Sequence, residues 1–240
     1  MQLLPIIASG SLALATTGFA NGFEDSFTAL NARDWSVANY TFKHPYFDTD
    51  WGARQVIANA GLTLRLGPQK DRENGYIGAS IRRRKATGYG LYEAVIKPAR
   101  GEGIITGFFT YTGPHYGTRH DEIDIEFLGE NTHQIHLATF VDGKRWNRFV
   151  NLGFDASDKP RSYSFKWEQD AIRWYVSGEL IYQRLSSDGA TPAEPGMLFA
   201  NIWAADPSIK AWSGLAAKGT KASAIIKHIS YTPSGDGLGS

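Results

Sequence analysis

The chain has 240 residues, of which 20% are charged, and its formal net charge is +1 at pH 7. This balance excludes the extended basic surface that nucleic-acid-binding and membrane-surface proteins use, so we predict neither kind of partner. The length suits a single domain with a sizeable core, and we expect a monomer. Because the chain has no cysteine, disulfides are excluded and the core alone must hold the fold.

The first twenty residues have the features of a secretory signal peptide. Residues 3–15 are apolar but too short to span a bilayer, and Gly18-Phe19-Ala20 offers a small-residue cleavage site. The amino-terminal end carries no Lys or Arg, so its only positive charge is the terminal amine. We therefore expect a signal peptide over 1–20, one folded domain over 21–240, and a secreted or periplasmic protein.

From residue 22 onward the sequence is typical of short strands joined by turns. Residues 22–35 are expected at a sheet edge, and the turn Asn59-Ala60-Gly61 joins 56–57 to 62–66. Further strands are predicted at 79–85, 88–98, 103–111, 121–129, 135–141, 149–152, 163–167, 172–176, 179–182, 197–203 and 222–231. Turn signals recur every ~8–12 residues and no helical period persists, which predicts an all-β sandwich of two antiparallel sheets.

Acidic and apolar residues alternate without a break over residues 121–127. Successive side chains of a strand point to opposite faces, so Glu122, Asp124 and Glu126 share one face. The apolar face consists of Ile123, Ile125 and Phe127. Three acids in a row repel one another, and each must be hydrated or partnered. A solvated strand face is one interpretation, and a functional row of carboxyl groups is the other.

Glycoside hydrolysis is the chemistry that fits such a row, because it uses two carboxyl groups that flank one glycosidic bond. A third acid between them can hold a proton and push the outer two pKa values apart. At ~3.3 Å per residue, the Cα atoms of Glu122 and Glu126 lie on the order of 13 Å apart. A retaining mechanism needs their carboxyl groups roughly 5–5.5 Å apart. The strand must therefore be concave on its acidic face.

Three segments resemble the bacterial lichenases, the β-1,3-1,4-glucanases of glycoside hydrolase family 16. They are residues 88–93 (GYGLYE), 108–114 (FFTYTGP) and 121–129 (DEIDIEFLG), within a similarity that runs from about 42 to 231. The resemblance implies a β-jelly-roll sandwich with a concave cleft that takes a polysaccharide. It also implies that Glu122 is the nucleophile, that Glu126 is the acid/base, and that Asp124 hydrogen-bonds one or both.

The resemblance further implies a set of substrate-binding residues in the cleft. Arg82 belongs to a basic run that is otherwise interpreted as a solvated or salt-bridged face, and Trp203 could equally be a core residue at a strand end. The full set is Arg82, Phe109, Tyr111, His120, His136, Asn201, Trp203 and Trp212.

Several positions depart from the lichenase pattern. His120 stands in place of a Trp, Ser80 in place of a Glu, and residues 136–140 (HLATF) replace Gln, Phe, Asn, Tyr and Tyr. His120 could contact a substrate carboxylate or simply lie in a solvated loop. Lys227 replaces the aspartate of the family's structural calcium site, so we predict no metal there and no cofactor.

The residues leave several functions open. A retaining endo-β-glucanase that cuts 1,3-1,4-linked or related β-glucans is the first. A depolymerase of acidic bacterial exopolysaccharide is the second, because amide and phenol groups that hold the glucan are missing from 136–140. A transglycosylase would use the same covalent intermediate. A non-catalytic carbohydrate-binding protein would require the acids to be lost, and all three are present.

Overall fold

The computed structural model describes residues 22–70, 72 and 74–235, and the expected signal peptide at 1–20 lies outside them. The described part of the chain has sixteen strands, of which twelve form a hydrogen-bonded path with the order β11-β10-β9-β8-β15-β6-β5-β16-β7-β12-β13-β14; β1 pairs with β16, β2 and β3 pair with β6, and β4 pairs with β5. Their bounds are β1 Phe23–Asp25, β2 Trp35–Val37, β3 Thr49–Trp51, β4 Val56–Ala58, β5 Leu62–Pro68, β6 Tyr76–Arg83, β7 Gly90–Lys97, β8 Ile104–Thr112, β9 Asp121–Leu128, β10 Gln134–Val141, β11 Lys144–Asn151, β12 Arg161–Trp167, β13 Ala171–Val176, β14 Glu179–Leu185, β15 Met197–Ala204 and β16 Ala222–Pro233.

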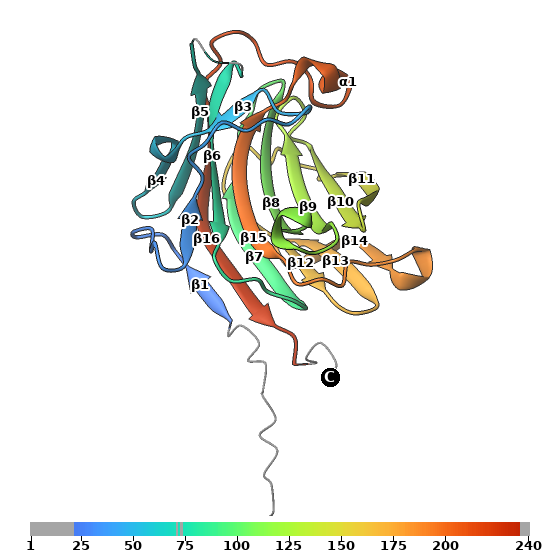
Figure 1. Ribbon diagram of the computed structural model, residues 1–240. Coiled ribbons are helices and arrows are strands. Elements are labelled where there is room, and N and C mark those ends of the chain that lie inside the picture. Colours follow the sequence, from blue (N-terminus) through green and yellow to red (C-terminus); the bar gives the residue numbers. More distant parts are fainter. Residues whose placement is uncertain (1–21, 71, 73, 236–240) are drawn as a thin grey trace, which may run out of the picture.

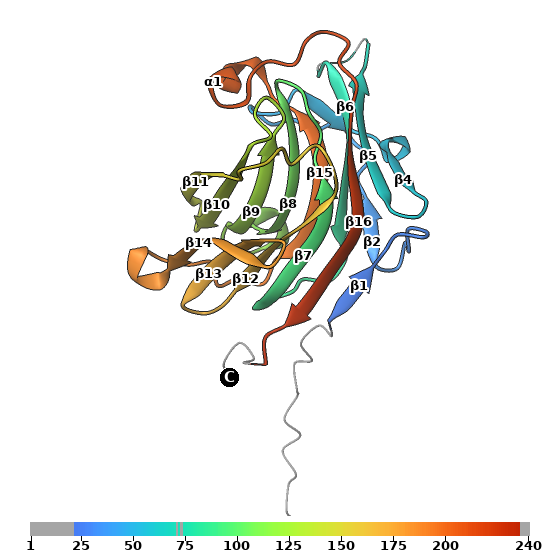
Figure 2. The ribbon, with the colours of Figure 1, turned by 180° about the vertical axis from the view of Figure 1, so that it is seen from behind.

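The strands form two curved layers that face each other. In Figure 1 the layer of β11, β10, β9, β8 and β15 lies in front, and β7, β12, β13 and β14 lie behind it. Figure 2 shows the same layers from behind, with β16 and β7 nearest the viewer. The strand pairs are antiparallel except for β3 with β6. The all-β prediction is confirmed.

Helical structure is confined to single turns in the described ranges. The bounds are α1 Lys210–Ser213, η1 Ala53–Gln55, η2 Pro114–Tyr116, η3 Ser186–Asp188 and η4 Pro207–Ile209. None of these segments is long and apolar enough to cross a bilayer.

The main core fills the space between the two layers. The apolar face of β9 contributes Ile123, Ile125 and Phe127 to it, all fully buried. Phe127 meets the Tyr163 ring of β12 edge-on at 4.7 Å. This burial fixes the orientation of β9, because a register slip of one residue would turn its acids into the core.

A smaller apolar cluster lies on the other face of the front layer. Its buried members are Trp51, Ile105, Leu128, Trp203 and Ala205. Ile105 and Leu128 are cross-strand partners of β8 and β9, and Trp203 of β15 is the partner of Ile105. The cluster therefore continues, along the same face, the side-chain column that contains the three acids.

The hairpin of β10 and β11 differs in one respect from expectation. The two-residue turn at Asp142 and Gly143 is present, with φ of 50° and 74°, as a type I′ turn requires. However, β11 begins at Lys144 and not at residue 149. It is an edge strand with most side chains exposed, so it lacks the alternation by which strands are recognised.

Candidate active site

The antiparallel register places each acid of β9 between two neighbours that share its face. The neighbours come from β8 on one side and β10 on the other, because side chains of paired residues project to the same side of a sheet. The pairs are Tyr111 and Phe140 beside Glu122, Phe109 and Ala138 beside Asp124, and Gly107 and His136 beside Glu126. The acids thus form the middle column of a face shared by three strands, where the family resemblance implies the substrate groove.

Glu122 is held by a histidine from the loop before its own strand. The Nε2 of His120 lies 2.6 Å from Oε2 of Glu122, whose side chain is 16% exposed. The His120 ring stacks on Phe140 at 4.6 Å and meets Tyr111 edge-on at 5.2 Å. Burial raises the pKa of Glu122 above its ordinary value, and the hydrogen bond and charge of His120 oppose that rise.

Asp124 is the most deeply buried of the three acids, at 4% exposed. Burial raises the pKa of Asp124 well above its ordinary value, and the charges of Glu122 and Glu126 raise it further. A hydrogen bond with Glu122 raises the pKa of Asp124 and lowers that of Glu122, as expected when protonated Asp124 donates to the Glu122 carboxylate. Trp174 Nε1 of the opposite layer donates to the backbone oxygen of Asp124 at 3.2 Å, which anchors the strand at this point.

Glu126 is held by a histidine from the neighbouring strand. Nδ1 of His136 lies 2.9 Å from Oε2 of Glu126, whose side chain is 19% exposed. The other ring nitrogen of His136 lies 3.3 Å from Oδ1 of Asn147 on β11. The rings of Phe149 and Trp212 contact His136 at 4.7 and 5.4 Å. Each of the two outer acids therefore has its own imidazole partner.

Asn201 of β15 lies one strand beyond Gly107, on the row of Glu126. Asn201 and Gly107 are cross-strand partners, and a Cβ on Gly107 would lie 2.6 Å from the Asn201 Oδ1. Only a glycine leaves room for the amide to lie across β8. The Asn201 Oδ1 is buried and has no hydrogen-bond partner within the described chain. A buried acceptor without a partner is costly, which suits a group that binds a ligand hydroxyl.

The other predicted binding residues of β6 and β8 lie on the same face. Arg82 donates from Nη1 to the Met197 sulfur at 2.8 Å, and its guanidinium lies 5.8 Å from the Tyr116 ring. Phe109 stacks on Phe199 at 5.1 Å, and Tyr111 is partly exposed. Substrate contact by these three residues stays a prediction.

The two predicted tryptophans occupy different environments. Trp203 is 5% exposed and stacks between Phe47, at 3.9 Å, and Trp212, at 6.2 Å. Its placement agrees with the alternative interpretation as a packed residue at a strand end. Trp212 of α1 is only partly buried, and its Nε1 has no hydrogen-bond partner among the described residues.

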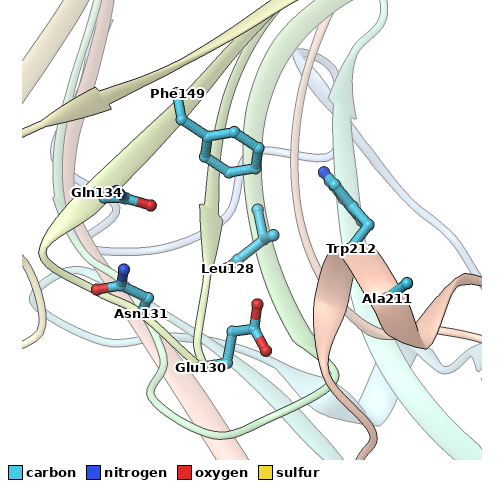
Figure 3. A pocket seen from close by; sticks show the side chains of 7 residues that line it. All are labelled: Leu128, Glu130, Asn131, Gln134, Phe149, Ala211 and Trp212. Carbon is cyan, nitrogen blue, oxygen red and sulfur yellow. The ribbon is translucent and has the colours of Figure 1, made fainter.

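A pocket of about 440 Å³ opens beside the Glu126 end of the acid column. Figure 3 shows Phe149 and Trp212 on two sides of Leu128, with the Glu130 carboxylate below them. The lining residues are Leu128, Glu130, Asn131, Gln134, Phe149, Ala211 and Trp212. Aromatic rings flanking carboxylate and amide groups are the surface that a sugar ring needs, because its faces are apolar and its rim is polar.

Sequence reasoning missed Asn147 and Phe149. Both lie on β11: Asn147 precedes the predicted strand at 149–152, and Phe149 is its first residue. The two-residue turn was nevertheless a sufficient signal, because it fixes the hairpin register and pairs Phe149 with His136.

No group of three or more acidic or histidine side chains is placed to hold a metal ion in the described part of the chain. The Lys227 ammonium, at the position where the resemblance implies a calcium-binding aspartate, donates to the Ala60 carbonyl at 3.3 Å. A cationic side chain does not fit a calcium site. The expectation that this position binds no metal stays a prediction.

Residues 43–222 match the glycosyl hydrolases family 16. This chain belongs to that family. It is 36% identical over 204 residues to a β-glucanase of Bacillus amyloliquefaciens, covering 85% of this chain and 82% of that one. It is 33% identical over 216 residues to the endo-1,3-1,4-β-glycanase ExoK of Rhizobium meliloti, covering 89% and 80%.

Among solved structures, the β-glucanase of Bacillus licheniformis superimposes with a TM-score of 0.83 at 33% identity, over 91% of this chain and all of that one. The likeness extends over nearly the whole described chain, so the predicted β-jelly-roll fold is confirmed. The protein is a glycoside hydrolase of family 16.

Proposed function

We propose that this enzyme is a retaining endo-β-glucanase that cuts 1,3-1,4-linked β-glucan through a covalent glycosyl-enzyme. One observation carries the proposal. Glu122, Asp124 and Glu126 share the groove face of β9, with His120 on the first acid and His136 on the last. The lichenase-type relatives support the choice of substrate.

The first half-reaction forms the covalent intermediate. The Glu122 carboxylate attacks the anomeric carbon while Glu126 gives its proton to the bridging oxygen, and the carbon–oxygen bond of the linkage breaks. Protonated Asp124 donates a hydrogen bond to Glu122, so it lies beside the ester that forms without carrying a third negative charge. The product is a Glu122 glycosyl ester and a shortened chain with a free hydroxyl.

The second half-reaction hydrolyses the ester. Glu126, now a carboxylate, takes a proton from water, whose oxygen attacks the same carbon. The bond to Glu122 breaks, Glu122 returns to a carboxylate, and Glu126 is again protonated. Two inversions retain the β configuration at the reducing end of the product.

Three measurements test the proposal. Barley β-glucan should release reducing sugar, and proton NMR during the first turnovers should show the β anomer of the product first. Glu122→Gln should lose nearly all turnover and still bind glucan, because the amide is isosteric with the acid but is a poor nucleophile. Immediate release of the α anomer, or undiminished turnover by Glu122→Gln, contradicts the assignment.

A depolymerase of acidic bacterial exopolysaccharide is the second candidate. The observation that favours it is that Ala138 and Phe140 replace an amide and a phenol on the groove floor beside Asp124 and Glu122. Parallel assays on barley β-glucan and a succinoglycan-type polymer separate the two. Release of reducing sugar from the succinoglycan-type polymer alone favours the depolymerase. Products that grow longer over time would indicate transglycosylation.

We propose export of the enzyme from the cell, on the basis of the apolar segment and cleavage site within residues 1–20. Mass spectrometry of protein from the culture medium should give a mature amino terminus near Asn21. Retention of Met1 in the cell-associated fraction contradicts export.

A further inference from the structure

Both ring nitrogens of His136 already have protein partners. Nδ1 faces Oε2 of Glu126 at 2.9 Å, and Nε2 faces Oδ1 of Asn147 at 3.3 Å. The ring is 2% exposed. A histidine has no other polar side-chain atom, so His136 has none left for a substrate hydroxyl. This contact pattern does not suit the substrate-binding role that the family resemblance implies.

The surroundings of His136 hold its ring in one plane. Phe149 lies next to it on β11, and Trp212 meets it edge-on from α1. An imidazole between two rings and two hydrogen bonds has little freedom to rotate. Oε2 of Glu126 is therefore tied to a rigid partner, and Oε1 is the oxygen left for the groove.

Asn147 is the outermost member of this chain of contacts. It lies on the exposed edge strand β11, and its Oδ1 lies 3.3 Å from Nε2 of His136. This contact helps to fix the orientation of the ring, and with it the direction in which Nδ1 meets Glu126. Because Asn147 is exposed, replacing it leaves the core between the layers unchanged.

We propose that His136 and Asn147 are positioning residues for the acid/base: Asn147 orients His136, and His136 holds Oε2 of Glu126 so that Oε1 meets the bridging oxygen. The inference rests on the proposed function, in which Glu126 protonates the leaving group. It assigns to β10 and β11 a part in general acid catalysis and not only in sugar binding.

The dependence of kcat/KM on the leaving group shows whether His136 and Asn147 position the general acid or only stabilise the fold. A dinitrophenolate leaves without protonation, whereas a sugar alkoxide needs the proton of Glu126. The ratio kcat/KM reports steps up to the first irreversible one, which is formation of the glycosyl-enzyme. A variant that misplaces Glu126 should therefore be impaired on glucan and nearly normal on a dinitrophenyl β-glycoside of a gluco-oligosaccharide.

The experiment compares kcat/KM of the full-length enzyme and its variants on these two substrates. A positioned general acid contributes ~10²–10⁴-fold, so we expect His136→Leu to lose about a hundredfold on barley β-glucan. Asn147→Leu should lose about tenfold, since it removes only the outer contact. Both variants should stay within about threefold of wild type on the dinitrophenyl substrate, because that reaction needs no acid.

Two further variants serve as rescue and control. His136→Gln should recover much of the activity on glucan, because its amide N–H can donate to Oε2 of Glu126. His133→Leu changes an exposed histidine in the turn before the same strand and should match wild type on both substrates.

Equal losses of kcat/KM on the two substrates would reveal a purely structural role for His136. Unchanged activity of His136→Leu and Asn147→Leu on glucan would exclude any role for either residue. Either result overturns the inference while the wild type remains active on glucan. An inactive wild type, by contrast, overturns the proposed function itself.

Discussion

At the scale of single residues, the two histidines that replace family residues contact the two outer acids of β9. His120 was expected to contact a substrate carboxylate or to lie in solvent. Its Nε2 lies 2.6 Å from the Glu122 carboxylate, and its ring is stacked on Phe140. Contact between His120 and a substrate carboxylate stays a prediction.

Replacing His120 by Phe tests that role. The variant keeps the aromatic contacts with Phe140 and Tyr111 but loses the hydrogen bond that opposes the raised pKa of Glu122. Because Glu122 must be ionised to attack in the proposed mechanism, the acidic limb of the kcat/KM profile should move to higher pH. Loss of a charge-assisted hydrogen bond costs about 1.5–3 kcal/mol, so activity at the optimum should fall roughly 10–100-fold.

The other titratable groups that face Glu122 are Asp124, Glu126 and Tyr111, and they are unchanged in this variant. The measurement is a pH series of initial rates on barley β-glucan, with His133→Phe as the matched control. An acidic limb that stays in place would mean that His120 does not influence the ionisation of Glu122.

The buried carboxyl group of Asp124 is expected to lower the stability of the fold at neutral pH. The pKa of Asp124 is raised by burial and by its two glutamate neighbours, so its ionised form is less favourable in the folded than in the unfolded state. This cost is absent below the unfolded-state pKa of about 3.9 and grows as the pH rises above it. Asp124→Asn should therefore be more stable than wild type at pH 7, equally stable near pH 3, and nearly inactive.

Thermal melting at pH 7 and pH 3 checks this expectation. A gain of 1 kcal/mol corresponds to about 2–4 °C for a domain of this size, so even a modest effect is measurable. Lower stability of Asp124→Asn at pH 7 would mean that the ionised Asp124 is compensated by contacts stronger than those described above.

At the scale of secondary-structure elements, the hairpin of β10 and β11 forms the edge of the layer beside the acids of β9. Its two-residue turn sets a register that puts Phe149 beside His136 and Asn147 beside Ala138. The same hairpin therefore supports Glu126 through His136 and lines the 440 Å³ pocket through Gln134 and Phe149. An edge strand suits this task, since its outer groups are exposed to ligands.

Phe149→Ala tests the pocket as a binding site for a sugar unit. The ring is 42% exposed, so its loss should leave the fold intact. A sugar that stacks on an aromatic ring loses about 0.5–1.5 kcal/mol without it, and KM for barley β-glucan should rise roughly 2–10-fold. Leu180→Ala, at an exposed apolar residue of β14, is the control. Equal KM values for Phe149→Ala and wild type would remove the pocket from the substrate path.

At the scale of the whole molecule, Asp121 ties the start of β9 to two distant segments. Its Oδ2 accepts from the backbone N–H groups of Ala193 and Glu194, and its Oδ1 accepts from that of Asp142. Burial favours the neutral acid, but these three N–H groups and the Arg119 guanidinium outweigh it and hold the pKa of Asp121 below its usual range.

A depressed pKa contributes stability above the unfolded-state value, and this stability is lost as the pH falls through the folded-state value. Asp121→Asn should therefore be less stable than wild type by about 2 kcal/mol at pH 7, with the difference shrinking below pH ~4. Urea unfolding across this pH range measures the effect. A constant difference at every pH would assign the loss to geometry and not to charge.

The position of Lys227 predicts a fold that does not depend on calcium. Its ammonium already binds the Ala60 carbonyl, and a divalent cation close to it would be repelled. Melting with a chelator and with added calcium should give the same midpoint. A large fall on chelation would show that this protein binds a stabilising cation at some other position.

The local pattern of residues 121–127 determined the strand, its two faces and the row of acids, because period-two alternation needs no information from the rest of the chain. Turn signals between short apolar runs likewise sufficed to predict a sandwich. The start of β11 could not be found in this way, since an exposed edge strand has no buried face to impose a pattern.

Tertiary structure alone decided which groups meet the acids. His120 lies only two residues before Glu122 in the chain, whereas His136 reaches Glu126 through the pairing of β9 with β10. Trp203 shows the opposite case: its position fitted a cleft wall, yet packing by Phe47 and Trp212 covers its ring. Alternation specifies the face on which a side chain lies, whereas contact depends on neighbours from other strands, which pairing brings together only in the folded chain.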